Sequence, residues 1–411
     1  MLRLAKVWRG IDGHIMGQTG PKHEYNERKC GMSGTMAWGK GLIAATLVFA
    51  GAWTASAQSE AAMPTKAEVE QGWIALYDGE TTFGWNLLGG ADWSGVGALA
   101  CKGGRGGGWA ATTSTFGDFE MVVKVRAAGE AGAGLAVRAK LDGHVTENGT
   151  VVIPIAGQAK GDTSEPKWQE IKVEAKGGVV KASVDGKDLG EFKTDNKQGY
   201  IGLLYYNKGA VELASAKLKP TTLEPIFNGK DLKGWEIIPG KKSVFAVVDG
   251  QMSIKDGNGQ IETTGQYKDF LLQLSIFSNG VEKPLNSGVF YRGPKGVFWK
   301  GYESQVRNQW EGDDRTKPVD FGTGGNYGNQ PTRKVLPSEK EWFYKTIVAN
   351  GNHSAVWING YLTSDFTDTR PVSPDQNAKE GYVPGPGTIH LQGHDPTTDL
   401  LFKNIVIQDY K

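Results

Sequence analysis

The chain has 411 residues, more than one hydrophobic core usually organises, so we expect two domains of roughly 150 to 190 residues each. Lys and Arg number 46 against 45 Asp and Glu, which gives a formal net charge of +1. This balance excludes a strongly basic surface, so we predict no nucleic-acid partner and no electrostatic binding to an anionic membrane.

The first 57 residues are predicted to be a leader that contains a signal peptide. Lys40 precedes an apolar run at residues 42–53, and the small residues 55–57 suit a signal peptidase. The run is too short for a stable transmembrane helix and no comparable run follows, so we predict no membrane span. We therefore expect cleavage after Ala57 and a periplasmic or secreted protein. The charged residues before Met32 favour a later start codon over a long leader.

The predicted mature chain is slightly acidic and nearly free of cysteine. It would hold 39 Lys and Arg against 42 Asp and Glu. Cys101 would be its only cysteine, so no internal disulfide is expected.

The rest of the chain consists of two copies of one sequence pattern. LYDGETTFGW at 76–85 returns as IFNGKDLKGW at 226–235. Further matches follow in the same order: FGDFEMVVKVR at 116–126 with YKDFLLQLSIF at 267–277, AGLAVR at 133–138 with SGVFYR at 287–292, and WQEIKVEAKGGVVKASVDG at 168–186 with WFYKTIVANGNHSAVWING at 342–360. The offset grows from 150 to 174 residues, which indicates a duplicated domain whose second copy acquired insertions. We predict the first repeat at residues 72–220 and the second at residues 223–411.

Both repeats are predicted to be antiparallel β-sandwiches. Segments such as 270–277 and 354–359 alternate apolar and polar residues, which is the period of half-buried strands. A short helical turn is expected near residues 66–71. The segments 311–340 and 367–386 are rich in Gly, Asn, Asp and Pro, and long loops on a rigid sandwich are usually functional. Tight hairpins are predicted at dipeptides that accept positive φ: Asp185-Gly186, Asp249-Gly250, Asn350-Gly351 and Asn359-Gly360.

Three strands of the second repeat, at 286–292, 301–307 and 388–394, are predicted to be polar on one face. A solvated outer face is the alternative, but such faces are usually rich in Lys, Glu and Thr. The matching strand of the first repeat, 199–205, has no His or Gln. We therefore locate the site in the second repeat. The residues that alternation places on the polar faces are Asn286, Arg292, Glu303, Gln305, Arg307, His390, Gln392 and His394.

Other signatures in the sequence are weak. His390, His394 and Glu303 could hold a divalent metal, although no local ligand spacing supports this, and a pair of structural histidines is the alternative. Exposed tryptophans such as Trp299 and Trp310 could stack on a sugar ring. No cofactor is predicted from a motif.

The second repeat resembles the 3-keto-disaccharide hydrolase domain. The resemblance runs from residue 224 to 411 through PIFNGKDLKGW, VVDGQM, YKDF, NSGVFYRG, GYESQV, GNYG, NGNHSAVWING, IHLQGH and FKNIVI. The first repeat resembles a degenerate copy that keeps the opening motif and the turns. Asn308 stands where the family has an aspartate, and Lys403 stands where it usually has an arginine. The resemblance implies a concanavalin A-like, laminin G-like jelly roll.

The resemblance also implies cleavage of glycosides whose sugar is oxidised at C3. A C3 ketone acidifies the hydrogen on C2, so a base removes it, the enolate expels the C1 substituent, and water adds to the enone. We assign Glu303 or His394 as the base, Arg292 as the oxyanion stabiliser, and His390 as the acid to the leaving oxygen. The residues assigned to substrate binding are Asn286, Gln305, Gln392, Tyr327 and Trp310.

The competing prediction is a non-catalytic, lectin-like protein, because the jelly roll serves carbohydrate binding equally well. A lectin would bind unmodified glycan without consuming a 3-keto-glycoside. A scaffold domain of an exported complex is a third alternative. The sugar and the oligomeric state are left open.

Overall fold

The computed structural model describes residues 62–130, 132–142, 145, 147–280 and 283–410. The predicted signal peptide lies outside these residues. The helix α2 (Lys66–Glu70) confirms the expected helical turn, and a capping box between Thr65 and Glu68 closes its first turn. Within the described ranges, the structure contains no helix with the length and hydropathy that a membrane span requires.

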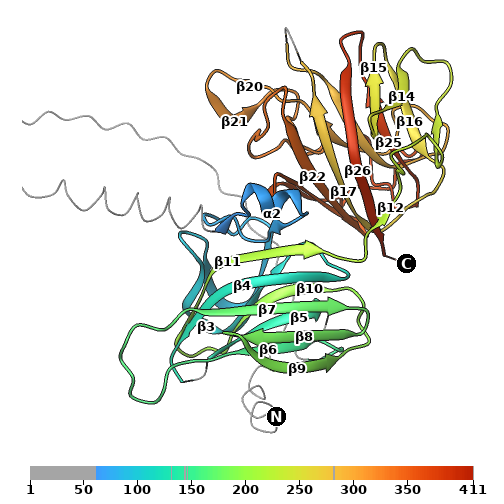
Figure 1. Ribbon diagram of the computed structural model, residues 1–411. Helices are drawn as coiled ribbons and strands as arrows, with labels where there is room; N and C mark the ends of the chain where they lie inside the picture. The colour runs from blue at the N-terminus through green and yellow to red at the C-terminus, as the bar shows by residue number, and fades with distance from the viewer. Residues whose placement is uncertain (1–61, 131, 143–144, 146, 281–282, 411) are drawn as a thin grey trace, which may run out of the picture. The chain divides into compact units, whose positions relative to one another are not determined.

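The first repeat is an antiparallel β-sandwich whose two layers join into one 11-stranded sheet (Figure 1). The long strand β3 pairs with both β10 and β11 and so connects the layers. Its strands are β1 (Ile74–Ala75), β2 (Trp85–Ser94), β3 (Leu99–Thr112), β4 (Phe119–Ala128), β5 (Ala133–Ala139), β6 (Val151–Ile155), β7 (Gln169–Lys176), β8 (Val179–Val184), β9 (Lys187–Lys193), β10 (Tyr200–Tyr205) and β11 (Ala210–Pro220).

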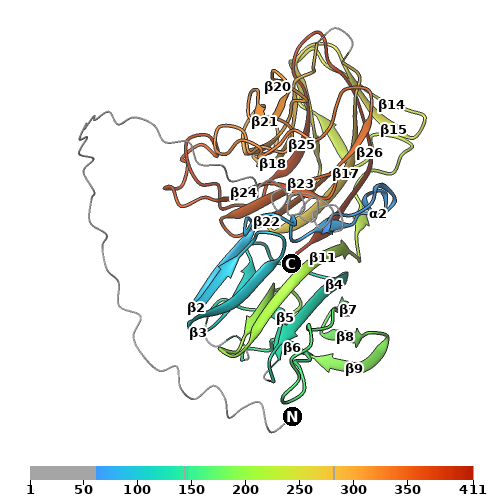
Figure 2. The ribbon, with the colours of Figure 1, turned by 90° about the vertical axis from the view of Figure 1, so that its left-hand side faces the viewer.

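The second repeat is an antiparallel β-sandwich with separate layers of eight and five strands (Figure 2). The five-stranded sheet has the order β13-β16-β25-β18-β19, and it carries the predicted polar strands. The strands are β12 (Glu224–Pro225), β13 (Trp235–Ile237), β14 (Val244–Val248), β15 (Gln251–Lys255), β16 (Gly259–Thr263), β17 (Phe270–Ser278), β18 (Ser287–Gly293), β19 (Tyr302–Val306), β20 (Trp310–Glu311), β21 (Asp314–Pro318), β22 (Trp342–Asn350), β23 (His353–Ile358), β24 (Tyr361–Thr367), β25 (Thr388–Gly393) and β26 (Asp399–Asp409).

The predicted hairpin dipeptides connect neighbouring strands. Asp185-Gly186 joins β8 to β9, Asp249-Gly250 joins β14 to β15, and Asn359-Gly360 joins β23 to β24. Both residues of each pair have positive φ, as a two-residue hairpin whose turn matches the strand twist requires. At Asn350-Gly351 only the glycine has positive φ.

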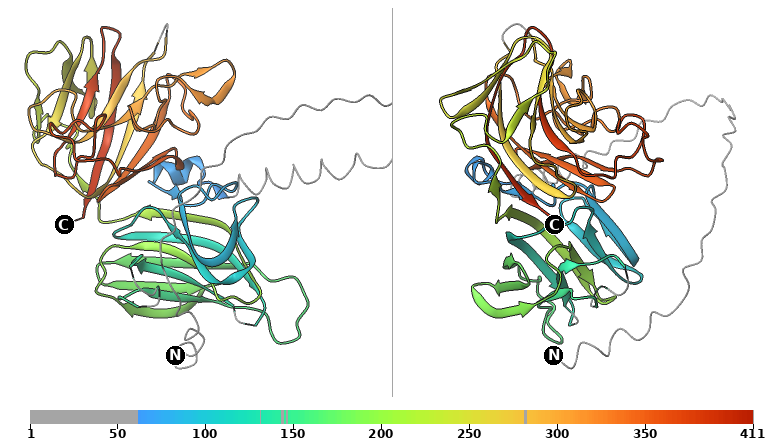
Figure 3. Two further views of the ribbon diagram at one scale, coloured as in Figure 1. Left: turned by 180° about the vertical axis from the view of Figure 1, so that it is seen from behind. Right: turned by 90° about the vertical axis from the view of Figure 1, so that its right-hand side faces the viewer.

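The segment 311–340 is more ordered than its composition predicts. Its first part is the two-stranded hairpin β20–β21, which projects from the second repeat (Figure 3). Farther along, the backbone of 324–327 pairs with the free edge of β19: Gly324 and Tyr327 donate N–H groups to the carbonyls of Gln305 and Glu303 at 3.0 and 2.9 Å. The predicted loop therefore protects the edge strand that carries the candidate carboxylate.

Candidate functional site

Strand register brings the polar residues of the second repeat onto one face of the five-stranded sheet. On β19, Tyr302 and Val306 pack into the core, so Glu303 and Gln305 point to the opposite face. Directly paired residues share a face, and the pairings extend the set across β18, β25 and β16. We call this surface the polar face. One row across it is Glu262, His390, Phe290 and Glu303, and the next is Gln260, Gln392, Gly288 and Gln305.

Glu303 is a buried carboxylate with an unused acceptor. Its side chain is 4% exposed, and among the described residues no donor reaches Oε2 within hydrogen-bonding distance. Burial raises the pKa of Glu303, and the nearby Asp320 adds to this, while Lys379, Lys345 and Trp299 oppose it. Gly288 on the neighbouring strand leaves space for the Glu303 side chain, because a Cβ at position 288 would lie 2.4 Å from Glu303 Oε1.

Lys379 from the segment 367–386 lies beside Glu303. Its Nζ atom is 3.9 Å from Glu303 Oε2. The ammonium is also 3.1 Å from the ring centroid of Trp299 and 4.8 Å from that of Tyr327. Burial lowers the pKa of Lys379. The structure thus places the predicted Tyr327 and the sugar-stacking candidate Trp299 at the site. It adds Lys379, which the sequence did not select.

Asp320 links two of the predicted binding residues, Asn286 and Gln305. Its Oδ2 atom accepts hydrogen bonds from Asn286 Nδ2 at 3.0 Å and Gln305 Nε2 at 3.3 Å. Asn286 Nδ2 is in turn 3.3 Å from Nε2 of His394, whose side chain is 43% exposed. Asp320 has φ of 52°, a conformation that is uncommon outside glycine and often occurs at functional sites. The sequence signal for Asp320 was only its position in a long polar loop.

His390 is held inside the polar face. The side chain is fully buried, with Nε2 at 2.6 Å from Thr388 Oγ1 and Nδ1 at 3.3 Å from Gln260 Oε1. Glu262 Oε2 lies 3.5 Å from Nε2. Burial lowers the pKa of His390 to about 4, so its imidazole is neutral at neutral pH. Gln260 and Glu262 alternate along β16 and were missed, although the pattern Gln-Ile-Glu carries the same signal as the other polar strands.

Arg292 takes a different position from the one expected. A register shift in β18 and a φ of 55° at Arg292 break the strand alternation, so its side chain leaves the polar face. The guanidinium is 2% exposed and bonds the carbonyls of Lys268, Gly351 and Val383 and the carboxylate of Asp269. It is therefore a structural clamp, and the assignment of Arg292 as the oxyanion stabiliser is corrected.

Arg138 of the first repeat supports this correction. It has φ of 60° and bonds the carbonyls of Phe116, Gly117 and Lys197 and the carboxylate of Asp118. Both repeats keep this arginine clamp, although only the second keeps the polar face. The buried arginine and its contacts therefore serve the structure of the sandwich in both repeats.

The remaining predicted residues are Gln392, Trp310 and Arg307, and only Gln392 lies on the polar face. Gln392 is buried on the polar face, and its Oε1 atom has no partner among the described residues. Trp310 lies on the hairpin β20–β21, where Arg315 stacks on its ring at 3.9 Å from the centroid. This stacking occupies one of the two faces of the ring. Arg307 donates to the carbonyl of Pro284.

The described residues contain no group of three or more His, Cys, Asp or Glu side chains suited to a metal ion. The ring nitrogens of His390 face Thr388 and Gln260, so the suggested ligand set of His390, His394 and Glu303 does not fit this arrangement. We assign no step to a metal.

The first repeat has lost its polar face residue by residue. The strand pairings of the two repeats show which positions are equivalent. The first repeat has Val152 at the position of Glu303, Pro154 at that of Gln305, Gly202 at that of His390 and Leu204 at that of Gln392. The face is instead a small hydrophobic cluster that includes Trp109, Ala111, Ala136 and Leu204. This confirms the contrast that the sequence predicted between the repeats.

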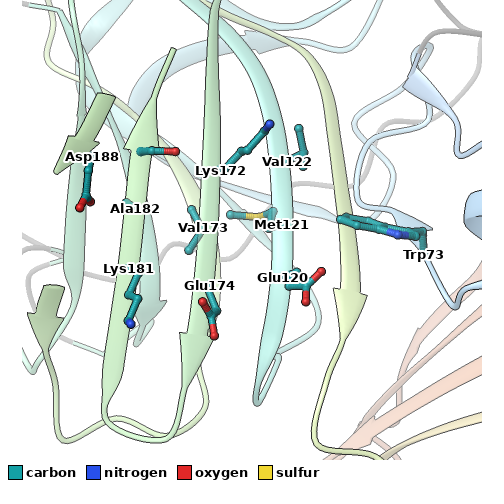
Figure 4. A pocket seen from close by; sticks show the side chains of 11 residues that line it. Trp73, Glu120, Met121, Val122, Lys172, Val173, Glu174, Lys181, Ala182 and Asp188 are labelled. Carbon is teal, nitrogen blue, oxygen red and sulfur yellow. The ribbon is translucent and has the colours of Figure 1, made fainter. Parts of the chain in front are cut away.

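A hollow of about 390 Å³ lies elsewhere on the first repeat, over the outer face of β4, β7 and β8 (Figure 4). It is lined by Trp73 and by side chains such as Glu120, Lys172, Glu174 and Lys181. Figure 4 shows these side chains standing apart rather than pointing at a common centre. This is the composition of a solvated sheet face.

The sequence model of the 3-keto-alpha-glucoside-1,2-lyase-like domain matches residues 72–216 and 222–408. A crystal structure of a proposed glycosyl hydrolase from Parabacteroides distasonis ATCC 8503 aligns with 46% of this chain and 94% of its own, at 23% identity and a TM-score of 0.37. The carbohydrate binding module CBM66 from Bacillus subtilis aligns with 43% of this chain and 96% of its own, at 14% identity and a TM-score of 0.32. No curated protein sequence matches the chain.

Proposed function

The chain belongs to the 3-keto-alpha-glucoside-1,2-lyase-like domain family and is a carbohydrate-acting protein; we propose that it is an exported enzyme that cleaves 3-keto-glycosides by elimination and hydration across C1 and C2. The observation that carries this proposal is the buried Glu303 carboxylate, whose Oε2 atom is unused by the described residues. Its position on the polar face of the second repeat supports a site in that repeat.

The elimination needs one base and groups that stabilise an enolate. In the proposed reaction Glu303 takes the proton from C2, and the electron pair moves to the C3 oxygen. The C1–O bond then breaks, the leaving oxygen takes a proton, and water adds to the enone. A base works best when its pKa lies near the operating pH, and burial moves that of Glu303 upward, in this direction.

The surroundings of Glu303 supply the remaining roles. Lys379, 3.9 Å from Glu303, is the cation that takes the enolate-stabilising role first given to Arg292. His394 is partly exposed and replaces the buried His390 as the proton donor to the leaving oxygen. The amides of Asn286, Gln305 and Gln392 bind hydroxyl groups. Ordinary glycosidases instead use two carboxyl groups that flank the glycosidic bond.

The test is release of the aglycone from 3-keto-glucosides by the full-length protein, with and without a chelator. Glu303→Gln keeps the shape but cannot take a proton, so kcat should fall by at least roughly 10²-fold while KM changes little. Glu311→Gln, at an exposed site on β20, is the matched control and should keep wild-type rates.

Each other outcome has a distinct meaning. Full activity of Glu303→Gln together with an inactive His394→Ala would make the histidine the base. Binding of unmodified glycan without consumption of any 3-keto-glycoside would identify a lectin and reject the proposed enzyme.

A further inference from the structure

Lys345 is a lysine buried inside the second sandwich, behind the strand that carries Glu303. It lies on β22 with its side chain on the core face, between Phe343 and Ile347, and is 1% exposed. Its Nζ atom bonds Ser304 O, Ser304 Oγ and Gln305 O, each at 2.9 Å. A buried ammonium is costly unless hydrogen-bonded, and these contacts all go to β19.

The three partners satisfy Lys345 in either protonation state. As an ammonium, Nζ donates to two carbonyls and to the Ser304 hydroxyl. As a neutral amine it donates to the two carbonyls and accepts from the same hydroxyl, which can reverse its role. Burial lowers the pKa of Lys345 to about 7, and the Glu303 charge opposes this shift. The charge of Lys345 is therefore coupled to that of Glu303 across the backbone of β19.

The first repeat shows what the fold requires at these positions. The sequence match of 168–186 with 342–360 shows that Ile171 is the equivalent of Lys345 in the first repeat. The strand pairings show that Ile153 is the equivalent of Ser304. Both isoleucines are fully buried members of the first core. The same repeat has Val152 in place of Glu303. The sandwich folds without the buried lysine, and the lysine is present where the carboxylate is present.

We propose that Lys345 is a positioning residue of the candidate active site, which from inside the sandwich fixes the backbone of β19 and stabilises the ionised form of Glu303. This inference rests on the proposed function. The other charged groups that act on Glu303 are Lys379 from the segment 367–386 and Asp320 from the segment 311–340. Both approach from the polar face, whereas Lys345 approaches through the strand.

The test is a carboxyl-carbon NMR titration of the full-length protein labelled at glutamate, with the Glu303 signal assigned by its loss in Glu303→Gln. In Lys345→Met the titration midpoint of Glu303 should move to higher pH than in wild type. The exposed control Lys233→Met should leave it unchanged. The acidic limb of the pH profile of kcat/KM should move in the same direction, with KM unaltered at a pH where Glu303 is ionised.

Stability separates this role from a merely structural one. Lys345→Met removes the cost of burying an ammonium. Gln305 O keeps the N–H of Gly324 as a partner, so we expect the variant to unfold at the same urea concentration as wild type or higher. If Lys345→Met fails to fold, the double variant Lys345→Ile/Ser304→Ile reproduces the pair of the first core and should give the same shift.

An unchanged Glu303 midpoint in a folded variant would overturn the inference. The NMR midpoint does not depend on turnover. A shifted midpoint in a protein that releases no aglycone would therefore reject the proposed function while leaving the coupling of Lys345 to Glu303 intact.

Discussion

His390 should make the second repeat sensitive to mild acid. Its neutral imidazole is buried against Thr388 and Gln260, and burial lowers its pKa to about 4 from the ordinary value of 6.5. The unfolded chain therefore takes up a proton at higher pH than the folded chain does. The stability due to this histidine is fully present above about pH 6.5 and is lost as the pH falls towards about 4.

The lowered pKa of His390 determines how much stability is lost in acid. A difference of 2.5 units between 6.5 and about 4 corresponds to about 3 kcal/mol, at 1.36 kcal/mol per unit. We expect a loss of this order in the free energy of unfolding between pH 7 and pH 4. Carboxylates elsewhere in the protein titrate in the same range, so the measured quantity is the difference in stability between wild type and His390→Gln. Glutamine does not titrate and places an amide nitrogen near the position of Nε2.

Urea unfolding at several pH values between 7 and 4 measures this difference. The stability of wild type should decline relative to His390→Gln as the pH falls. Glu262 Oε2 lies 3.5 Å from the ring and is the group that could reverse the sign. If wild type gains stability relative to the variant in acid, Glu262 holds an imidazolium and the argument from burial is refuted.

The remaining predictions concern the arginine clamp and Asp320. Arg292→Ala should lower the free energy of unfolding by about 3–5 kcal/mol, because it leaves the partners of a buried guanidinium unpaired, and KM of the folded fraction should not change. Arg138→Ala is the matched change in the first repeat and should cost a similar amount by urea unfolding; a stable but inactive Arg292→Ala would restore its catalytic role. Asp320→Ala should raise KM several-fold, because it frees the amides of Asn286 and Gln305, and steady-state kinetics with an unchanged KM would show that Asp320 does not hold the site.

The sequence alone determined the duplication, the sandwich architecture and the repeat that carries the polar face. These properties depend on local features. A strand alternates its side chains every two residues, and Asp-Gly and Asn-Gly dipeptides accept positive φ, so both can be read without knowledge of neighbouring strands. The same alternation correctly placed Glu303 and Gln305 on one face and His390 and Gln392 on another strand of that face.

Only the tertiary structure decided which groups surround Glu303. Lys379, Asp320 and Lys345 reach it from two loops and from the opposite layer of the sandwich, and no period in the sequence relates these positions. Alternation failed at Arg292, because a register shift and a positive φ turn its side chain towards backbone carbonyls. Trp310 was predicted as an exposed tryptophan that could stack on a sugar, and only the structure shows that Arg315 stacks on its ring. Contacts between distant segments depend on strand order and loop path, which are properties of the folded chain.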